Sequence, residues 1–474
     1  MTSDRPNFRT TALIIASALF MEQLDSTVLA TALPTMARSF NVSPLNMSVA
    51  LTSYLLALAM FIPASGYFAD RFGAKRMFRI AIGVFTAGSI LCGQAPTLSL
   101  LVAARLLQGL GGAMMVPVGR LVLLRTVAPE NLVSAMAWFT VPALLGPVVG
   151  PPLGGFIVTY ASWRWIFYIN VPIGFLGMYL VTRYIQDVRE ADPGRFDRMG
   201  FLLSCVSLSC LMYAVEVGGR SGGASLRATV ALLAVGLLAG LAYLGHARGL
   251  AYPILDFKLM RIPTFGLSVL GGSLTRITAG ALPFLLPLML QVGFGVSAAR
   301  SGVITFSVAA GSLLMKMVAP PILRRFGFRN TLMWNSLIAT FFLAICAAFR
   351  PGWPMFWINA VLLAGGFFQS LQFTALNTVA YADIPQARMS AATSFYSTFQ
   401  QLTLSLGICI SSAVLTLTIF LFGHSGPQLS DFSIAFLVVT AISFTASPIC
   451  ARMPVDAGNA MSGYRPSVTT EIAI

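Results

Sequence analysis

Charged residues are scarce in this sequence, and their scarcity excludes a soluble protein. Asp, Glu, Lys and Arg make up only 9% of the 474 residues, whereas soluble domains contain about 25%. Histidine occurs twice and the six cysteines form no CxxC pair, so we expect neither a metal site nor a disulfide framework. The sequence contains no P-loop pattern, which argues against ATP as an energy source, and we expect no cofactor.

The chain has long apolar runs in place of charge. Hydrophobic residues make up 57% of the sequence, and runs long enough to span a bilayer recur from end to end. Transmembrane β-barrels show short alternating segments instead, so these spans are predicted to be helices. The sequence thus predicts an all-α, multi-pass membrane protein. Fourteen runs are found, at residues 12–33, 47–68, 78–95, 99–121, 132–159, 164–184, 199–217, 226–245, 264–290, 298–320, 331–349, 354–380, 392–421 and 431–452.

The basic residues indicate how the chain is oriented in the membrane. A net charge of +15 is compatible with a nucleic-acid partner, but the distribution of Lys and Arg argues against one. With the N-terminus in the cytoplasm, about 20 basic residues fall on the cytoplasmic side and about six on the other side. This bias predicts that both termini are cytoplasmic. It also predicts that the chain contacts the lipid bilayer and binds no nucleic acid.

Two carboxylates stand inside the first run, where ionised groups cost several kcal/mol. Glu22 and Asp25 are three residues apart and therefore share one face of a helix. We interpret this face as part of a polar path, with Asp25 as a proton carrier and Glu22 as a modulator or ligand. A third acid, Glu216, lies near the end of the seventh run, where we expect an interfacial structural role.

Arg105 lies within the fourth run and needs a cavity or a carboxylate partner, because a cation in hydrocarbon is costly. Snorkelling of its long side chain toward the outer interface is the alternative. Acids are rare in the spans, so Asp25 and Glu22 are its natural partners. We therefore predict that Arg105 is a counter-charge for the proton carrier.

A short basic segment between the second and third runs has an internal repeat. Residues 323–329 (LRRFGFR) repeat residues 69–75 (ADRFGAK) at an offset of 254 residues. A repeat at that distance indicates two homologous helical bundles related by an axis along the membrane normal. Gly73 is expected to supply a positive φ at the turn.

Small residues are regularly spaced in the fifth run. Gly146, Gly150 and Gly154 are four residues apart, so they form a flat stripe on which another helix can approach closely. The prolines between them remove backbone donors. The complete GPxxGPxxGG pattern consists of Gly146, Pro147, Gly150, Pro151, Gly154 and Gly155.

These motifs resemble those of the major facilitator superfamily over nearly the whole chain. The first basic segment matches its GxxxDRxGxxR-type motif, and the resemblance implies a gate latch. Arg324 replaces the acid in the second copy, so the latch role is assigned to the first copy only. Arg105 matches the helix-4 RxxxG motif linked to proton transfer, and GPxxGPxxGG resembles the motif of antiporters. The predicted latch residues are Gly66, Asp70, Arg71, Gly73, Lys75 and Arg76.

Four further segments resemble one branch of that family, the fourteen-helix drug:proton antiporters. Residues 24–28 (LDSTV) with 32–34 (ALP) are similar to its helix 1, and residues 163–172 (WRWIFYINVP) to its entry into helix 6. Residues 291–295 (QVGFG) and 400–402 (QQL) are most similar to the MdtD-type subgroup. The resemblance implies the major facilitator fold, in which two six-helix bundles flank two additional transmembrane helices.

The runs and the resemblance together predict the division of the chain. We expect the N-terminal bundle, the additional helix pair and the C-terminal bundle to be separated by cytoplasmic segments. The predicted parts are a cytoplasmic N-terminus (1–11), the first bundle (12–184), a linker (185–198), two inserted helices (199–245), a cytoplasmic loop (246–263), the second bundle (264–453) and a cytoplasmic tail (454–474).

Polar and basic residues in the second bundle predict a substrate cavity. Arg276 and Lys316 lie within spans, where lipid exposure is costly, although Lys316 is near enough to an end to snorkel. If both face the cavity, the substrate is an organic anion held by charge-assisted hydrogen bonds. Amide side chains also join helices without binding substrate, which is the alternative for the other cavity candidates. These are Gln369, Gln372, Asn377 and Gln401.

We predict a monomeric, proton-coupled efflux transporter of the inner membrane that exchanges drugs or other small molecules for protons by alternating access. An exporter of organic anions such as di- or tricarboxylates is the first alternative. A polytopic membrane enzyme is the second, although two histidines and three membrane acids leave little catalytic machinery. A channel or sensor is the third, and the two-bundle repeat argues against it.

Overall fold

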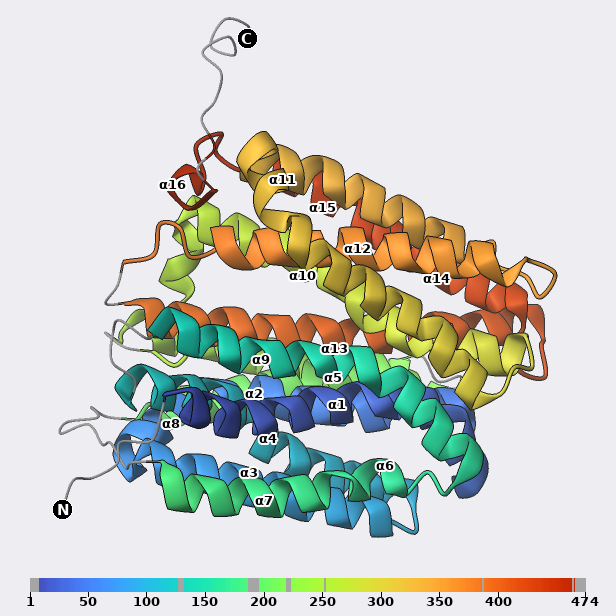
Figure 1. Ribbon diagram of the computed structural model, residues 1–474. Helices are drawn as coiled ribbons and strands as arrows, with labels where there is room; N and C mark the ends of the chain where they lie inside the picture. The colour runs from blue at the N-terminus through green and yellow to red at the C-terminus, as the bar shows by residue number, and fades with distance from the viewer. Residues whose placement is uncertain are drawn as a thin grey trace, which may run out of the picture.

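The protein is a bundle of long helices that run side by side along one direction (Figure 1). The computed structural model describes residues 8–126, 132–185, 196–218, 223–250, 253–385, 388–462 and 464, and these contain no β-strand. The first helices are α1 (Phe8–Phe40), η1 (Pro44–Met47), α2 (Ser48–Phe72), α3 (Ala74–Gln94), α4 (Leu98–Thr126), α5 (Leu132–Tyr160), α6 (Trp165–Tyr168) and α7 (Asn170–Tyr184).

Two helices, α8 (Arg198–Gly218) and α9 (Gly223–Arg248), come next in the chain. Helix α8 packs against α9, α2 and α13, and its Ser209 contacts Met60 of α2. The later helices are η3 (Phe257–Arg261), α10 (Pro263–Leu288), the π-helix η4 (Met289–Gly293), α11 (Ala298–Cys346), α12 (Met355–Val379), α13 (Met389–Phe422), α14 (Leu429–Phe444), α15 (Ala446–Ala451) and α16 (Asn459–Ser462).

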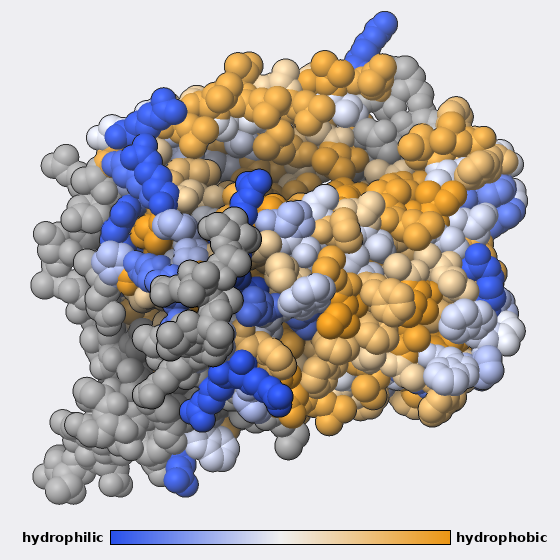
Figure 2. All heavy atoms as spheres, turned by 90° about the horizontal axis from the view of Figure 1, so that it is seen from above, coloured by the Kyte–Doolittle hydropathy of each residue, from blue (hydrophilic) through white to orange (hydrophobic). Residues whose placement is uncertain are grey.

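The described helices form a membrane domain. Twelve of their segments are long and apolar enough to cross a bilayer. In the face seen in Figure 2, hydrophobic side chains cover the middle, and hydrophilic ones gather toward the two ends of the helices. Because lipid tails cannot hydrogen-bond to polar groups, this banding is that of a multi-pass membrane protein.

The internal repeat is visible in the backbone. Gly73 has a φ of 92° and separates α2 from α3, and Gly327, 254 residues later, has a φ of 69° and breaks α11. A side chain at either position would be strained, because L-residues rarely adopt a positive φ. The positive φ predicted for Gly73 is confirmed. Both turns lie at the end of the bundle where α1 begins, which we call the near end.

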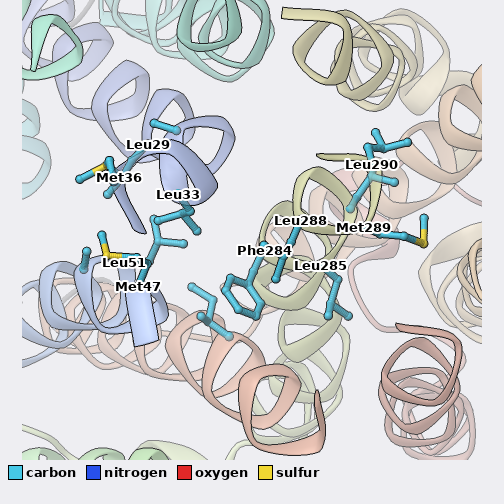
Figure 3. Packing of buried hydrophobic residues seen from close by; sticks show 14 of the residues in the cluster. Leu29, Leu33, Met36, Met47, Leu51, Phe284, Leu285, Leu288, Met289 and Leu290 are labelled. Atoms are coloured by element: carbon cyan, nitrogen blue, oxygen red, sulfur yellow. The ribbon is translucent and has the colours of Figure 1, made fainter. Parts of the chain in front are cut away.

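A buried apolar cluster joins α1 and α2 to α10 at the opposite, far end of the bundle. In Figure 3, Leu33 and Leu51 lie on one side of the contact, and Phe284 and Leu288 of α10 on the other. A hydrogen bond from Gln291 Nε2 to the carbonyl oxygen of Thr31 crosses the same contact at 3.0 Å. The two parts of the chain are thus sealed together at the far end.

The buried apolar clusters of the near end do not cross between the two parts. Among the described residues, one cluster draws only on α1–α4, α7 and the residue that follows it, and includes Ile15, Phe78 and Met115. The others draw only on α9 and later segments. The described core therefore holds the two parts together at the far end and leaves them separate at the near end.

Candidate functional site

Asp25 forms a buried ion pair inside the N-terminal part of the bundle. Its Oδ2 lies 2.5 Å from Nη1 of Arg105, and the two residues are 3% and 0% exposed. The pair joins the middle of α1 to the first third of α4, 80 positions apart in sequence. A buried charge is tolerated only when it is paired and hydrogen-bonded, and these two groups neutralise each other through Nη1, whereas Nη2 of Arg105 is buried without a partner.

Three neutral side chains complete the shell around the carboxylate. Gln108 Nε2 and Asn170 Nδ2 both donate to Asp25 Oδ1, at 2.8 and 2.9 Å. The same two amides donate to Ser89 Oγ at 2.7 and 3.4 Å. Side chains of α3, α4 and α7 therefore converge around a single acid of α1.

Arg105 is held on several sides. Its Nε donates to the carbonyl oxygen of Ala50 at 3.0 Å, and its Nη1 also donates to Gln108 Oε1 at 2.6 Å. The guanidinium carbon lies 4.2 Å from the centre of the Tyr54 ring, in a cation–π contact. The snorkelling alternative for Arg105 is therefore wrong, because its guanidinium is held within the bundle by these partners.

Glu22 lies one helical turn from Asp25 but outside this pair. It is only 4% exposed, and its Oε2 has no hydrogen-bond partner. The hydroxyl of Tyr54 is likewise buried without a partner. Burial of polar oxygens without hydrogen bonds is costly, so these two groups stand out in the site. The side chain of Glu216, the third acid predicted in a span, lies outside the described residues.

The glycine stripe of α5 packs directly on α1. A Cβ built at Gly146 would lie 2.7 Å from Cβ of Gln23, and one at Gly154 would lie 2.6 Å from the carbonyl oxygen of Val28. Gly155 faces the other way, where a Cβ would lie 2.4 Å from the carbonyl oxygen of Ala298 at the start of α11. Helix α5 therefore contacts both parts of the chain.

A cavity of about 550 Å³ lies between the two parts of the bundle. Helices α1 and α5 line it on one side, with Gln23, Thr27, Pro147 and Pro151, and α10–α13 line it on the other. Gln23 and Thr27 flank Asp25 in the sequence, yet Asp25 does not line the cavity. One helix thus presents the ion pair on one face and the cavity wall on another.

The two predicted cations of the second part have different surroundings. Lys316 lines the cavity and its Nζ donates to Thr374 Oγ1 at 2.7 Å. Arg276 is buried behind the wall, and its Nη2 donates to Asn377 Oδ1 at 2.7 Å and to the hydroxyl of Tyr396 at 3.0 Å. Asn377 itself lines the cavity, so it links Arg276 to the cavity wall.

The predicted glutamines are divided between cavity and packing. Gln369 lines the cavity, and its Nε2 is buried without a partner. Gln372 is buried among helices instead, where it accepts a hydrogen bond from Asn335 at 2.8 Å and donates to the carbonyl oxygen of Leu332 at 3.2 Å. Gln401 is half-buried and does not line the cavity.

The predicted latch residues lie at the near end, away from the ion pair. Arg71 and Arg76 are exposed, and Asp70 and Lys75 are half-buried at the turn between α2 and α3. A Cβ built at Gly66 would meet nothing within 4 Å, so this glycine is not required by close packing.

Sequence reasoning missed Gln108, Asn170 and Ser89 as members of the site. A signal was available for two of them. Gln108 is three residues from Arg105 and so lies on the same helix face, and Asn170 is an amide within an apolar run. Ser89 offered none, because isolated serines are common in membrane helices.

An all-helical membrane domain with a buried acid–cation pair in one part and a large cavity between two parts defines a secondary transporter. Solved structures support this fold. A crystal structure of the POT family transporter PepTSo aligns over 94% of this chain and 98% of its own, with a TM-score of 0.69 and 13% identity. That of a D-xylose-proton symporter aligns over 94% and 97%, with a TM-score of 0.66 and 13% identity.

The chain belongs to the Major Facilitator Superfamily, whose sequence model matches residues 15–408. It is 39% identical over 452 residues to a protein of Klebsiella pneumoniae (strain 342) named putative multidrug resistance protein MdtD, with 94% of each chain covered. A protein of the same name from Cronobacter sakazakii is 39% identical over 468 residues, with 96% of this chain and 97% of the relative covered. The predicted family and MdtD-type subgroup are confirmed, and the enzyme alternative is dropped.

Proposed function

We propose that this protein is a proton-coupled efflux transporter of the inner membrane, in which Asp25 carries the proton. The observation that supports this most is the buried Asp25–Arg105 pair on the same helix that lines the cavity. Protonation of Asp25 removes its charge and breaks the ion pair with Arg105, so the attraction between α1 and α4 depends on whether Asp25 is protonated. Movement of α1 then changes the cavity wall at Gln23 and Thr27, which couples the proton to the substrate.

The topology we propose has fourteen spanning helices. Helix α5 and the part of α11 beyond Gly327 add two spans to the twelve long apolar segments. Two six-helix bundles, 12–184 and 264–453, then flank the pair in 199–245. Both termini, the linker 185–198 and the loop 246–263 lie in the cytoplasm, so the near end is cytoplasmic and the far-end seal closes the protein to the outside.

The glycine stripe and the basic turn have roles in this cycle. Contact of Gly155 in α5 with Ala298 in α11 helps to keep the outer part of the bundle closed, and the other glycines of the stripe hold α5 against α1. Asp70, Arg71 and their neighbours brace the cytoplasmic ends of helices in the opposite, outward-open state. The substrates are small molecules, and the name of the relatives, putative multidrug resistance protein, suggests more than one drug. The working unit is a monomer, because the cavity lies within one chain.

A proteoliposome screen under an imposed pH gradient tests the proposal. We expect the wild-type protein to accumulate a subset of small molecules and to move protons in the opposite direction. Asp25→Asn should lose proton-driven transport down to the rate of protein-free liposomes, because the amide cannot release a proton. Substrate exchange without a gradient should persist in this variant. The matched control is Asp456→Asn, which changes an exposed acid of the C-terminal segment; proton-driven transport by Asp25→Asn contradicts the proposal.

A second candidate function, export of an organic anion, is favoured by one observation. Among the described residues that line the cavity, Lys316 is the one charged side chain. A single cation in an otherwise neutral cavity attracts carboxylates and repels lipophilic cations. Arg276 adds a second positive charge behind Asn377.

Lys316→Gln separates the two candidates. For a panel of di- and tricarboxylates, the loss of a charge-assisted contact should raise KM roughly tenfold. For lipophilic cations the same change should lower KM, because repulsion is removed. Arg276→Gln should act in the same direction for carboxylates, and Arg300→Gln, an exposed arginine, is the charge-matched control. Carboxylate transport with an unchanged KM in both cavity variants contradicts anion binding by these residues.

A further inference from the structure

We propose that Asn170 is a positioning residue of the proton site, whose carboxamide turns over when Asp25 takes up a proton. In the structure the amide N–H group of Asn170 donates a hydrogen bond to the carboxylate of Asp25. After protonation, the amide oxygen would accept a hydrogen bond from the new carboxyl O–H. This inference rests on the proposed function of Asp25 and extends it to α7.

Local structure fixes Asn170 at the carboxylate. The helix is interrupted at Ile169, between α6 and α7, and Asn170 is the first residue of α7. The side chain is fully buried, and its Nδ2 lies 2.9 Å from Asp25 Oδ1. Phe167, three residues earlier, packs 6.0 Å from the guanidinium carbon of Arg105. The entry into α7 therefore contributes to both members of the ion pair.

The amide oxygen of Asn170 is the spare acceptor of the site. Asn170 Oδ1 is buried and has no hydrogen-bond partner. The corresponding atom of the other amide, Gln108 Oε1, is occupied, because it accepts from Arg105 Nη1 at 2.6 Å and from Cys92 Sγ at 3.6 Å. Buried polar atoms of native proteins are rarely left unpaired, and an exception requires an explanation. A role in the second protonation state supplies one.

The two protonation states require different partners. An ionised carboxylate only accepts hydrogen bonds, whereas a protonated one must also donate. When Asp25 Oδ1 gains a proton, it becomes a hydrogen-bond donor. The N–H of Asn170 then faces another donor and not an acceptor. Rotation of the carboxamide by about 180° about Cβ–Cγ replaces that N–H with Oδ1, and the hydrogen bond is restored with its direction reversed. Gln108 cannot do the same without releasing Arg105.

The other charged or titratable groups around Asp25 belong to four helices. They are Glu22 of α1 itself, Tyr54 of α2, Cys92 of α3 and Arg105 of α4. A suitable group must donate to the ionised form of Asp25 and accept from its protonated form through the same contact. Arg105 can only donate. The other three make no direct hydrogen bond to Asp25 among the described contacts. Asn170 is therefore the member of the shell suited to both states.

Infrared titration of the purified full chain in lipid tests the proposal without a substrate. The carboxyl C=O band that disappears in Asp25→Asn reports the protonated form of Asp25. In Asn170→Leu, the pH at which this band is half-formed should rise by about 0.5–1 unit, because the ionised form loses a stronger hydrogen bond than the protonated form does. In the isosteric Asn170→Asp the rise should exceed one unit, because a second carboxyl group lies beside the first.

Controls separate this inference from a structural role and from the proposed function. Asn335→Leu removes another buried amide, which lies in α11 and is hydrogen-bonded to Gln372, and should leave the titration unchanged. The amide C=O band of Asn170 should also shift with the protonation of Asp25. If Asn170→Leu does not fold, the shift of the Asn170 amide C=O band in the otherwise wild-type chain still tests the inference, and an amide band that does not respond to protonation of Asp25 contradicts it. Unchanged titration in the Asn170 variants overturns the inference, whereas proton-driven transport by Asp25→Asn overturns the proposed function.

Discussion

Replacing Arg105 with leucine is expected to lower the free energy of unfolding by about 3–5 kcal/mol and to abolish transport. The substitution leaves the carboxylate of Asp25, which is 3% exposed, without its counter-ion. It also removes the donor to Ala50 and one partner of Gln108. Breaking one side of a buried pair costs more than the pair contributes, because a lone buried charge remains.

The double variant Asp25→Asn/Arg105→Leu distinguishes charge balance from packing. It removes both charges, so we expect it to recover more than half of the lost stability and none of the proton coupling. Unfolding measured in bicelles gives the stability, and imposed pH gradients give the coupling. Arg79→Leu, at an exposed arginine of α3, should change the stability by less than about 0.5 kcal/mol. Equal destabilisation in the single and double variants would indicate that packing, and not charge, dominates.

Gly150→Ala is expected to have the second largest effect, a loss of about 1–3 kcal/mol in stability together with most of the transport rate. A Cβ at this position would lie 2.1 Å from Oγ1 and 2.9 Å from Cβ of Thr27. Helix α1 must therefore move away from α5. Because Thr27 lines the cavity and Asp25 lies two residues earlier, the movement disturbs both sites.

Two further variants test this explanation. Thr27→Ala removes the nearest atom, so the double variant Gly150→Ala/Thr27→Ala should recover part of the stability. Gly66→Ala is the matched control, since a Cβ there meets nothing within 4 Å and alanine favours a helix over glycine. We expect Gly66→Ala to be neutral or slightly stabilising in thermal unfolding. A similar loss in both glycine variants would contradict close packing as the cause.

The position of α1 explains how two distant events are linked. One face of the helix holds Asp25 against α4 and α7, and another face, with Gln23 and Thr27, both lines the cavity and packs on the α5 glycines. The far-end seal adds Leu33 of the same helix. A change of charge at Asp25 therefore acts directly on the helix that lines the cavity, forms part of the far-end seal and packs on α5. No long series of intervening residues is needed to link these sites.

The sequence by itself determined the class of protein, most helix boundaries and the residues that carry charge in the membrane. Low charge and repeated apolar runs require membrane helices, because backbone groups in lipid must be satisfied within each segment. The cost of burying charge singled out Asp25 and Arg105. The basic segment predicted a positive φ at Gly73, which the backbone confirms, since glycine adopts a positive φ without strain.

Only the tertiary structure decided which side chains meet. The partners of Asp25 come from positions 80 and 145 residues away, and local periodicity carries no information on such distances. Lipid tails are as apolar as a protein core, so a hydrophobic pattern does not show which helix face is buried and which faces lipid. For the same reason the sequence could not show that Gln369 lines the cavity and Gln372 joins helices. Helix packing, and not residue type, separates a binding residue from a structural one.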